Sequence, residues 1–200
     1  MIGLRLGAKR FDHWVRRFGF GSGTGVDLPG EQQGIILDPK NYSGSSMGNM
    51  PIGQGLSVTP IQMATAYTAI ANHGVLRRPY VIAGDQREPR RVLSRPTADS
   101  VSRMLEGVLG PGGTAQEASV DGYKLAGKTG TAEKPDEFGG YSKTKFVASF
   151  IGYAPARDPR LLVAVMVDEP KGEIYGGVVA APAFEKIISF ALPYLRIPPD

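Results

Sequence analysis

The chain has 200 residues, of which 42% are hydrophobic, and a formal net charge of +4 at pH 7. This length and composition suit one folded domain, or one domain lacking a lobe, and argue against global disorder. The absence of cysteine excludes a disulfide scaffold, a cysteine-based zinc site and a thiol nucleophile. His13 and His73 are far apart and have no ligand pattern around them, so we expect no metal site and no cofactor.

Basic residues cluster weakly at positions 9–17 and 87–95, without interleaved aromatic residues. This pattern is typical of a solvated positive face, and we expect no nucleic-acid partner. No segment reaches the roughly 18 apolar residues that a membrane-spanning helix needs. The first residues also lack the apolar core and cleavage site of a signal peptide.

Two helices are predicted in the first part of the chain. The first has an apolar stripe at helical spacing, ends at Gly19, and places Trp14 in the core; its members are Phe11, Trp14, Val15 and Phe18. The second begins at Thr59, which can cap it, with Pro60 at the first helical position. Gln62 completes a capping box with Thr59.

A short strand is predicted at Tyr80-Val81-Ile82, and an amphipathic helix follows around residues 101–108. Residues 123–133, 145–153 and 161–168 predict a three-stranded antiparallel meander. The segment Leu161–Val167 is apolar almost throughout, which is typical of a strand covered on both faces.

The last helix is expected to run from about Val178 or Pro182 to Leu192. Its predicted contacts with the sheet are Phe184, Ile187, Ile188, Ala191 and Leu195. Helices before and after one antiparallel sheet indicate an α+β fold, an antiparallel sheet flanked by helices.

The candidate site lies in residues 123–134, where a cation, two hydroxyls and a bare glycine occupy four consecutive positions. In an extended segment Lys128 and Gly130 share one face, and Thr129 and Thr131 share the other. Gly130 leaves a gap through which a ligand backbone can approach. This combination suits capture of an anionic, peptide-like substrate, although an ordinary polar edge strand has the same pattern.

The sequence GYKLAGKT at residues 122–129 also matches the spacing G-x-x-x-x-G-K-[ST] of a phosphate-binding loop. Such a loop must follow a buried strand and open a helix. Residues 114–120 show no strand-like alternation, and Gly130 and Pro135 prevent a helix from continuing after Thr129. A nucleotide-binding function is therefore disfavoured.

Lys-Thr-Gly is a signature of class A β-lactamases and penicillin-binding proteins. With its surroundings, the chain resembles the transpeptidase domain of class B penicillin-binding proteins over nearly all of its length and in the family's order. The matching segments are IGQG (52–55), VTP (58–60), GGTA (112–115), GYKLAGKTGTAEK (122–134), DEP (168–170), Gly176-Gly177 and Ala181-Pro182 with Phe184.

The resemblance implies the penicillin-binding protein and serine β-lactamase-like fold, of which residues 1–200 form the C-terminal portion of a single transpeptidase domain. Residues 1–122 would be mainly helical with loops, 123–168 the meander and 178–195 the C-terminal helix. The implied activity is cross-linking of peptidoglycan stem peptides ending in D-Ala-D-Ala, through a serine acyl-enzyme that β-lactam antibiotics block.

The resemblance also implies roles for individual residues. Thr129 and Thr131 would hydrogen-bond the terminal carboxylate of the substrate, with Lys128 adding positive potential and relaying protons. The N–H of Thr131 would donate to the oxyanion, Gly130 would admit the substrate backbone, and Tyr175 would line the pocket.

The nucleophile is expected to lie outside the chain, because the family's S-x-x-K and S-x-N motifs precede K-T-G. The one S-x-x-K string, at Ser142 to Lys145, is rejected because a strand places the two side chains about 10 Å apart on opposite faces. The chain alone is therefore expected to be inactive. The apolar strand Leu161–Val167 would expose an unpaired edge, so the soluble species is expected to contain the upstream portion of the domain.

By resemblance the domain belongs on the extracytoplasmic face of the bacterial inner membrane, with an N-terminal anchor outside this chain as its only membrane contact. The match is closest to division-type members. A non-catalytic peptide-binding module remains an alternative function.

Overall fold

The computed structural model describes residues 1–84 and 88–200, so Arg87 of the weak basic cluster lies outside the described residues. The chain forms two compact units. The first contains Met1–Ala69 and Val75–Val92, and the second contains Ile70–Gly74 and Leu93–Asp200. Assignment of the whole chain to one domain stays a prediction.

The first unit is built from short helices and one small antiparallel ribbon. Its elements are α1 (Ile2–Leu6), α2 (Ala8–Arg17), η1 (Pro39–Asn41), α3 (Ser46–Asn49), η2 (Met50–Ile52), most of α4 (Pro60–Ala71), and the paired strands β1 (Val75–Leu76) and β2 (Arg90–Arg91). Phe11 and Val15 of α2 are buried with Met50. Trp14 was wrongly predicted as core, because it lies 38% exposed with the Arg17 guanidinium 5.5 Å from its ring centre.

The start of α4 confirms the predicted capping box. The Gln62 N–H donates to Thr59 Oγ1 at 3.2 Å, and the Thr59 N–H donates to Gln62 Oε1 at 2.9 Å. The side-chain nitrogen of Gln62, Nε2, also donates to two loop carbonyls, those of Ser22 and Gln33, at 2.8 Å each. These bonds explain how the Gln62 side chain is fully buried without an unsatisfied polar atom.

The prediction of a strand at residues 80–82 is wrong. The N–H groups of Val81 and Ile82 instead donate to the two carboxylate oxygens of Asp27, at 2.7 and 2.5 Å. A strand would need those donors for a neighbouring backbone, so the distant carboxylate fixes a bend that local sequence does not indicate.

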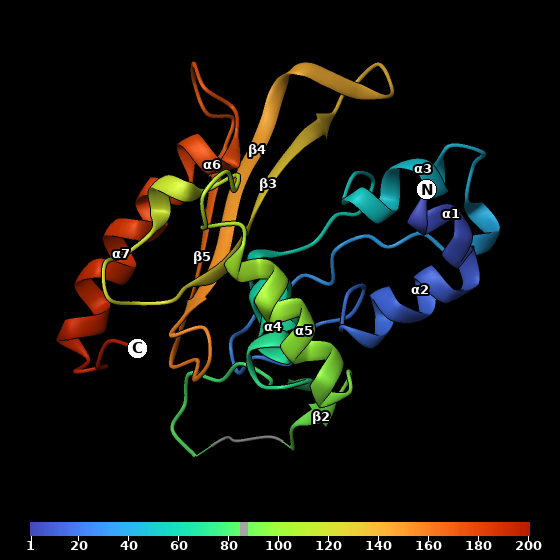
Figure 1. Ribbon diagram of the computed structural model, residues 1–200. Coiled ribbons are helices and arrows are strands. Elements are labelled where there is room, and N and C mark those ends of the chain that lie inside the picture. The colour runs from blue at the N-terminus through green and yellow to red at the C-terminus, as the bar shows by residue number, and fades with distance from the viewer. Residues whose placement is uncertain (85–87) are drawn as a thin grey trace. The chain divides into compact units, whose positions relative to one another are not determined.

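The second unit is organised around the predicted meander, which is confirmed (Figure 1). Strands β3 (Ala126–Pro135), β4 (Tyr141–Ala154) and β5 (Leu161–Asp168) are antiparallel in the order β3-β4-β5. The remaining elements of this unit are α5 (Arg95–Glu106), η3 (Gln116–Ala118), α6 (Gly176–Val179) and α7 (Ala181–Tyr194). The boundaries differ from the prediction, because β3 begins at Ala126 rather than at residue 123. The hairpin turn is also shorter, because β3 ends at Pro135 and β4 begins at Tyr141.

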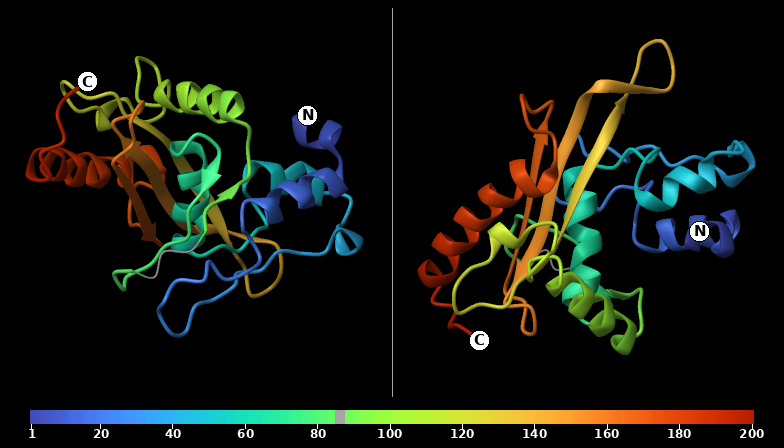
Figure 2. Two further views of the ribbon diagram at one scale, coloured as in Figure 1. Left: turned by 90° about the horizontal axis from the view of Figure 1, so that it is seen from below. Right: turned by 45° about the horizontal axis from the view of Figure 1, so that its top comes forward.

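Helices contact both faces of the sheet, as an α+β fold requires. Phe150 of β4 packs on Phe184 of α7, with ring centres 4.6 Å apart. Helix α7 runs beside the sheet in the views of Figure 1 and Figure 2. On the opposite face of β4, the Tyr153 hydroxyl donates to Ser102 Oγ of α5 at 2.8 Å.

Helix α7 buries a narrower stripe than the sequence predicted. Fully buried positions are Ala181, Phe184, Ile188 and Leu192. Ile187 and Leu195, predicted to pack on the sheet, are instead 45% and 51% exposed. The helix is apolar on nearly all sides, so residue type alone does not identify the face that meets the sheet.

The prediction that no segment is long and apolar enough to span a membrane is wrong by length and composition alone, because residues Gly176–Tyr194 meet both requirements. The buried stripe of α7 against the sheet, however, is what a core helix of a folded domain has.

Strand β5 also differs from expectation, because Leu161–Val167 is half-buried throughout rather than covered on both faces. Among the described strands it pairs with β4 alone, which leaves its outer edge without a strand partner.

Candidate functional site

The candidate residues lie in the middle of β3, which is an edge strand of the sheet. Lys128 pairs with Ile151 of β4, and Gly130 pairs with Ser149. In the part of the chain that the structure describes, no strand pairs with the other edge of β3. That edge therefore offers backbone groups with which an extended peptide can pair.

Thr129 and Thr131 point to the same side of β3, as the alternation predicts. Thr131 Oγ1 accepts a hydrogen bond from the N–H of Gly176 at 3.0 Å. Thr129 Oγ1 lies 3.1 Å from Thr114 Oγ1. Because Thr131 Oγ1 accepts the hydrogen bond from Gly176, the Thr131 hydroxyl proton remains available to donate to a ligand.

The exposed Lys128 side chain folds back along its own strand. Its ammonium nitrogen donates to the backbone oxygen of Thr129 at 2.9 Å and approaches Thr129 Oγ1 at 3.3 Å. A full positive charge therefore lies next to the threonine hydroxyl, an arrangement that favours an anionic ligand.

Two glycines allow the backbone to pack closely at this point. A Cβ on Gly176 would lie 2.4 Å from the Gly130 carbonyl oxygen and 2.3 Å from that of Ser149. A Cβ on Gly177 would lie 2.1 Å from the Thr114 carbonyl oxygen. The Gly176-Gly177 pair thus brings the start of α6 directly onto β3 and β4.

Tyr175 is the residue immediately before α6, and its side chain is 62% exposed. Its neighbour Gly176 makes the hydrogen bond to Thr131, so the structure brings Tyr175 close to the β3 residues along the chain.

Thr114 is a site residue that the sequence analysis did not identify. The sequence contained it within the GGTA segment, but only its contact with Thr129 indicates a role.

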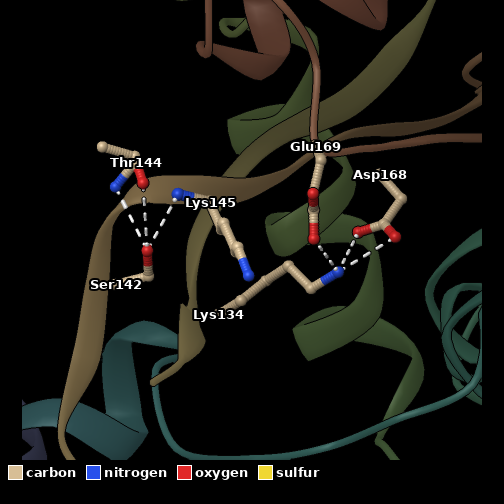
Figure 3. Close-up of polar contacts among 6 residues, drawn as sticks. All are labelled: Lys134, Ser142, Thr144, Lys145, Asp168 and Glu169. Atoms are coloured by element: carbon tan, nitrogen blue, oxygen red, sulfur yellow. Dashed lines mark hydrogen bonds and ion pairs between the residues drawn. The ribbon is translucent and has the colours of Figure 1, made fainter. Parts of the chain in front are cut away.

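Ser142 serves the backbone at an irregularity in the hairpin. The pairing register of β3 with β4 shifts between Glu133 and Pro135. The buried Ser142 Oγ accepts from the N–H groups of Thr144 and Lys145, at 3.2 and 3.1 Å. Figure 3 shows the Lys145 side chain running away from the Ser142 hydroxyl, so the pair lacks the side-chain contact that a nucleophile and its base need.

An ion cluster lies beside the same irregularity (Figure 3). The ammonium nitrogen of Lys134 is 2.9 and 3.0 Å from the two carboxylate oxygens of Asp168 and 2.8 Å from Glu169 Oε1. The hydrogen bond from Lys134 lowers the pKa of Glu169 below its ordinary value. Hydrogen bonds to Glu169 and then Asp168 raise the pKa of Lys134.

The phosphate-loop interpretation is contradicted by the strand. Lys128 and Thr129 lie inside β3, which continues as a strand to Pro135. A phosphate-binding loop would require a helix N-terminus at this point.

Comparison with known proteins identifies the family. A family model described as the penicillin-binding protein transpeptidase domain matches residues 1–189. The chain belongs to this family. Its relatives are class B penicillin-binding proteins, and its fold is that of their transpeptidase domains.

Two curated relatives illustrate the similarity. The chain is 40% identical to stage V sporulation protein D of Bacillus subtilis, over 99% of this chain and 32% of that protein. It is 37% identical to the peptidoglycan D,D-transpeptidase FtsI of Escherichia coli, over 92% of this chain and 32% of that protein. The chain therefore spans about a third of the length of these relatives.

Two solved structures have the same fold. Penicillin-binding protein 3 of Mycobacterium tuberculosis in complex with ampicillin superposes with a TM-score of 0.89 at 36% identity, covering 98% of this chain and 48% of that one. The transpeptidase domain of penicillin-binding protein 3 from Burkholderia pseudomallei gives 0.89 at 39% identity, covering 100% and 61%.

Proposed function

We propose that this chain supplies the substrate-binding strand of a penicillin-sensitive peptidoglycan D,D-transpeptidase. The observation that carries the proposal is the open edge of β3, where Lys128, Thr129 and Thr131 present one cation and two hydroxyls. Family membership and the relatives named as D,D-transpeptidases support the reaction class.

The stem peptide would lie extended along β3 with its terminal carboxylate at the threonine hydroxyls. Thr129 and Thr131 would donate hydrogen bonds to that carboxylate, with the Lys128 ammonium strengthening them. Gly130 would admit the peptide backbone, and Tyr175 would form one wall beside Thr131. The N–H of Thr131 would be one oxyanion donor.

The nucleophile would come from the upstream portion of the domain. Its serine oxygen would attack the carbonyl carbon of the penultimate D-alanine, giving up its proton, and the terminal D-alanine would leave as the protonated amine. An amine from a second stem peptide would then attack the acyl-enzyme, forming the cross-link and returning the proton to serine. A β-lactam would acylate the same serine when its ring amide opens.

No described strand pairs with the outer edge of β5, and this supports the upstream portion as a partner, because an apolar edge strand needs cover or pairing. Family membership supports a location of the domain on the extracytoplasmic side of the bacterial inner membrane. Its anchor would belong to the longer protein.

Covalent labelling by a fluorescent penicillin, read in denaturing gels, tests this proposal. We expect a labelled band from the transpeptidase domain that joins this chain to its upstream portion, and no band from the chain alone. Unlabelled benzylpenicillin should compete the band away. Reversible binding of a stem peptide without any labelled band would favour the non-catalytic binding module instead.

A further inference from the structure

The loop between β5 and α6, residues 169–175, leads directly to the candidate site. It begins at Glu169, whose backbone is in the left-handed region with φ of 48°. It ends at Tyr175, just before the glycine that donates to Thr131. Residues 171–173 in its middle are exposed. The position of Tyr175 therefore depends on how the two ends of this loop are held.

Both ends are attached to the same strand, β3. At the far end the Gly176 N–H bonds Thr131 Oγ1. At the near end Lys134 bonds Asp168 and Glu169, which we call the Lys134 clamp. The side chain of Lys134 spans β4 to do so, since β4 lies between β3 and β5 in the sheet. Thr131 and Lys134 are three residues apart, so one short segment of β3 holds the whole loop.

The local structure explains why the clamp forms at Lys134. The register shift between Glu133 and Pro135 frees Lys134 from regular pairing, and Ser142 satisfies the backbone donors that the shift leaves on β4. The Glu169 N–H donates to the Phe146 carbonyl at 2.9 Å, which fixes its backbone beside the irregularity. A non-glycine residue with positive φ persists only where surrounding contacts hold it, and the clamp supplies one of them.

We propose that Lys134 is a positioning residue for acylation: through Asp168 and Glu169 it fixes the loop that carries Tyr175 to Thr131. This inference rests on the proposed function, because it concerns the same site. Lys134 itself touches no reacting atom in this scheme. It acts by keeping one wall of the site at a constant distance from the substrate-binding threonines, and small displacements of such walls reduce acylation rates strongly.

The test uses the transpeptidase domain that joins this chain to its upstream portion, with a fluorescent penicillin in stopped-flow acylation. We expect Lys134→Met to lower the second-order acylation rate by about tenfold, mainly in the acylation step rather than in initial binding. Lys134→Arg should restore most of the rate, because its guanidinium can still bond both carboxylates.

Lys143→Met is the matched control. Lys143 lies in the same hairpin and its side chain is 85% exposed, with an ion pair to Glu133 at 3.6 Å. The substitution removes the same charge from the same hairpin without touching the clamp, so the acylation rate should be unchanged. Equal losses in both lysine variants would overturn the inference, since charge alone would then explain them.

Amide hydrogen exchange of residues 171–176 provides a readout independent of activity. Exchange should accelerate in Lys134→Met and stay at the wild-type rate in Lys143→Met. If Lys134→Met does not fold, Glu169→Gln, which keeps the hydrogen bond but loses the charge, should show a smaller change of the same kind. Wild-type exchange and acylation in a folded clamp variant would overturn the inference. Absence of wild-type labelling would instead overturn the proposed function, and exchange would still show whether the clamp holds the loop.

Discussion

Gly176 donates its backbone N–H to the side-chain oxygen of Thr131 at 3.0 Å, joining the first residue of α6 to the edge strand of the sheet. Gly176 is buried, so its N–H has no access to water as an alternative acceptor. The Thr131 hydroxyl therefore has a structural role in addition to the proposed contact with a substrate carboxylate. The structural role predicts an effect of substitution on stability, and the substrate contact predicts an effect on acylation.

Replacement of Thr131 by valine should reduce both stability and acylation, whereas replacement by serine should preserve both. Valine keeps the shape but leaves the Gly176 N–H without a partner, which costs about 1–3 kcal/mol in the free energy of unfolding. Chemical denaturation and fluorescent-penicillin acylation measure the two effects. A stable Thr131→Val variant would contradict the structural role, and one that acylates at the wild-type rate would contradict the substrate contact.

Replacement of Gly176 by alanine should destabilise the second unit and displace α6 from the sheet. The new Cβ would overlap the carbonyl oxygens of Gly130 and Ser149, and such overpacking typically costs about 1–3 kcal/mol. Gly44→Ala is the control, because a Cβ there meets no atom within 4 Å. Urea denaturation of the two variants should show a lowered midpoint for Gly176→Ala alone.

The Lys134 clamp should depend on pH with a definite sign. The pKa of Glu169 lies below its ordinary 4.5, so its contribution is complete above pH 4.5 and is lost as the pH falls through the depressed value. The pKa of Lys134 lies above its ordinary 10.5, so its contribution is complete below pH 10.5 and is lost as the pH rises through the raised value.

Carbon-13 NMR titration of the Glu169 carboxyl checks this prediction. Lys134→Met should move the Glu169 pKa upward, because the Lys134 hydrogen bond is the largest cause of its depression. In that variant burial and the Asp168 charge raise this pKa and together outweigh the smaller lowering by Lys145, so the depression should be lost. An unchanged titration in Lys134→Met would show that the clamp does not form in solution.

The parts of the fold that follow from the sequence are those set by local patterns. Thr59, Pro60 and Gln62 predict the start of α4 because a capping box is complete within four residues. The meander is predicted because strand periodicity is also local. The bend held by Asp27 at Val81 and Ile82 was missed because its partners are 54 and 55 residues apart.

The same distinction applies to the candidate site. Lys128 to Thr131 form one continuous motif, and the alternation of their side chains follows from an extended strand. The contacts of Thr131 with Gly176 and of Thr129 with Thr114 join segments 45 and 15 residues apart. Sequence pattern predicts which side chains share a face, but it carries no information on which distant backbone meets that face.

The exposed stripe of α7 should be a contact surface for the upstream portion of the domain. Ile187, Phe190 and Tyr194 lie one helical turn apart, and the last two rings stack with centres 5.5 Å apart. Phe190 and Tyr194 are 68% and 73% exposed. Exposed aromatic residues grouped on one face typically mark a protein interface.

Phe190→Glu should therefore weaken association between the chain and a separately expressed upstream portion. A buried unpaired carboxylate is costly at an interface, so co-purification and penicillin labelling of the mixture should both fall. Phe138→Glu is the matched control, because Phe138 is 95% exposed at the hairpin tip and belongs to a different surface. Equal association of both variants would show that the α7 stripe is not the contact, and the unpaired edge of β5 would then be the remaining candidate.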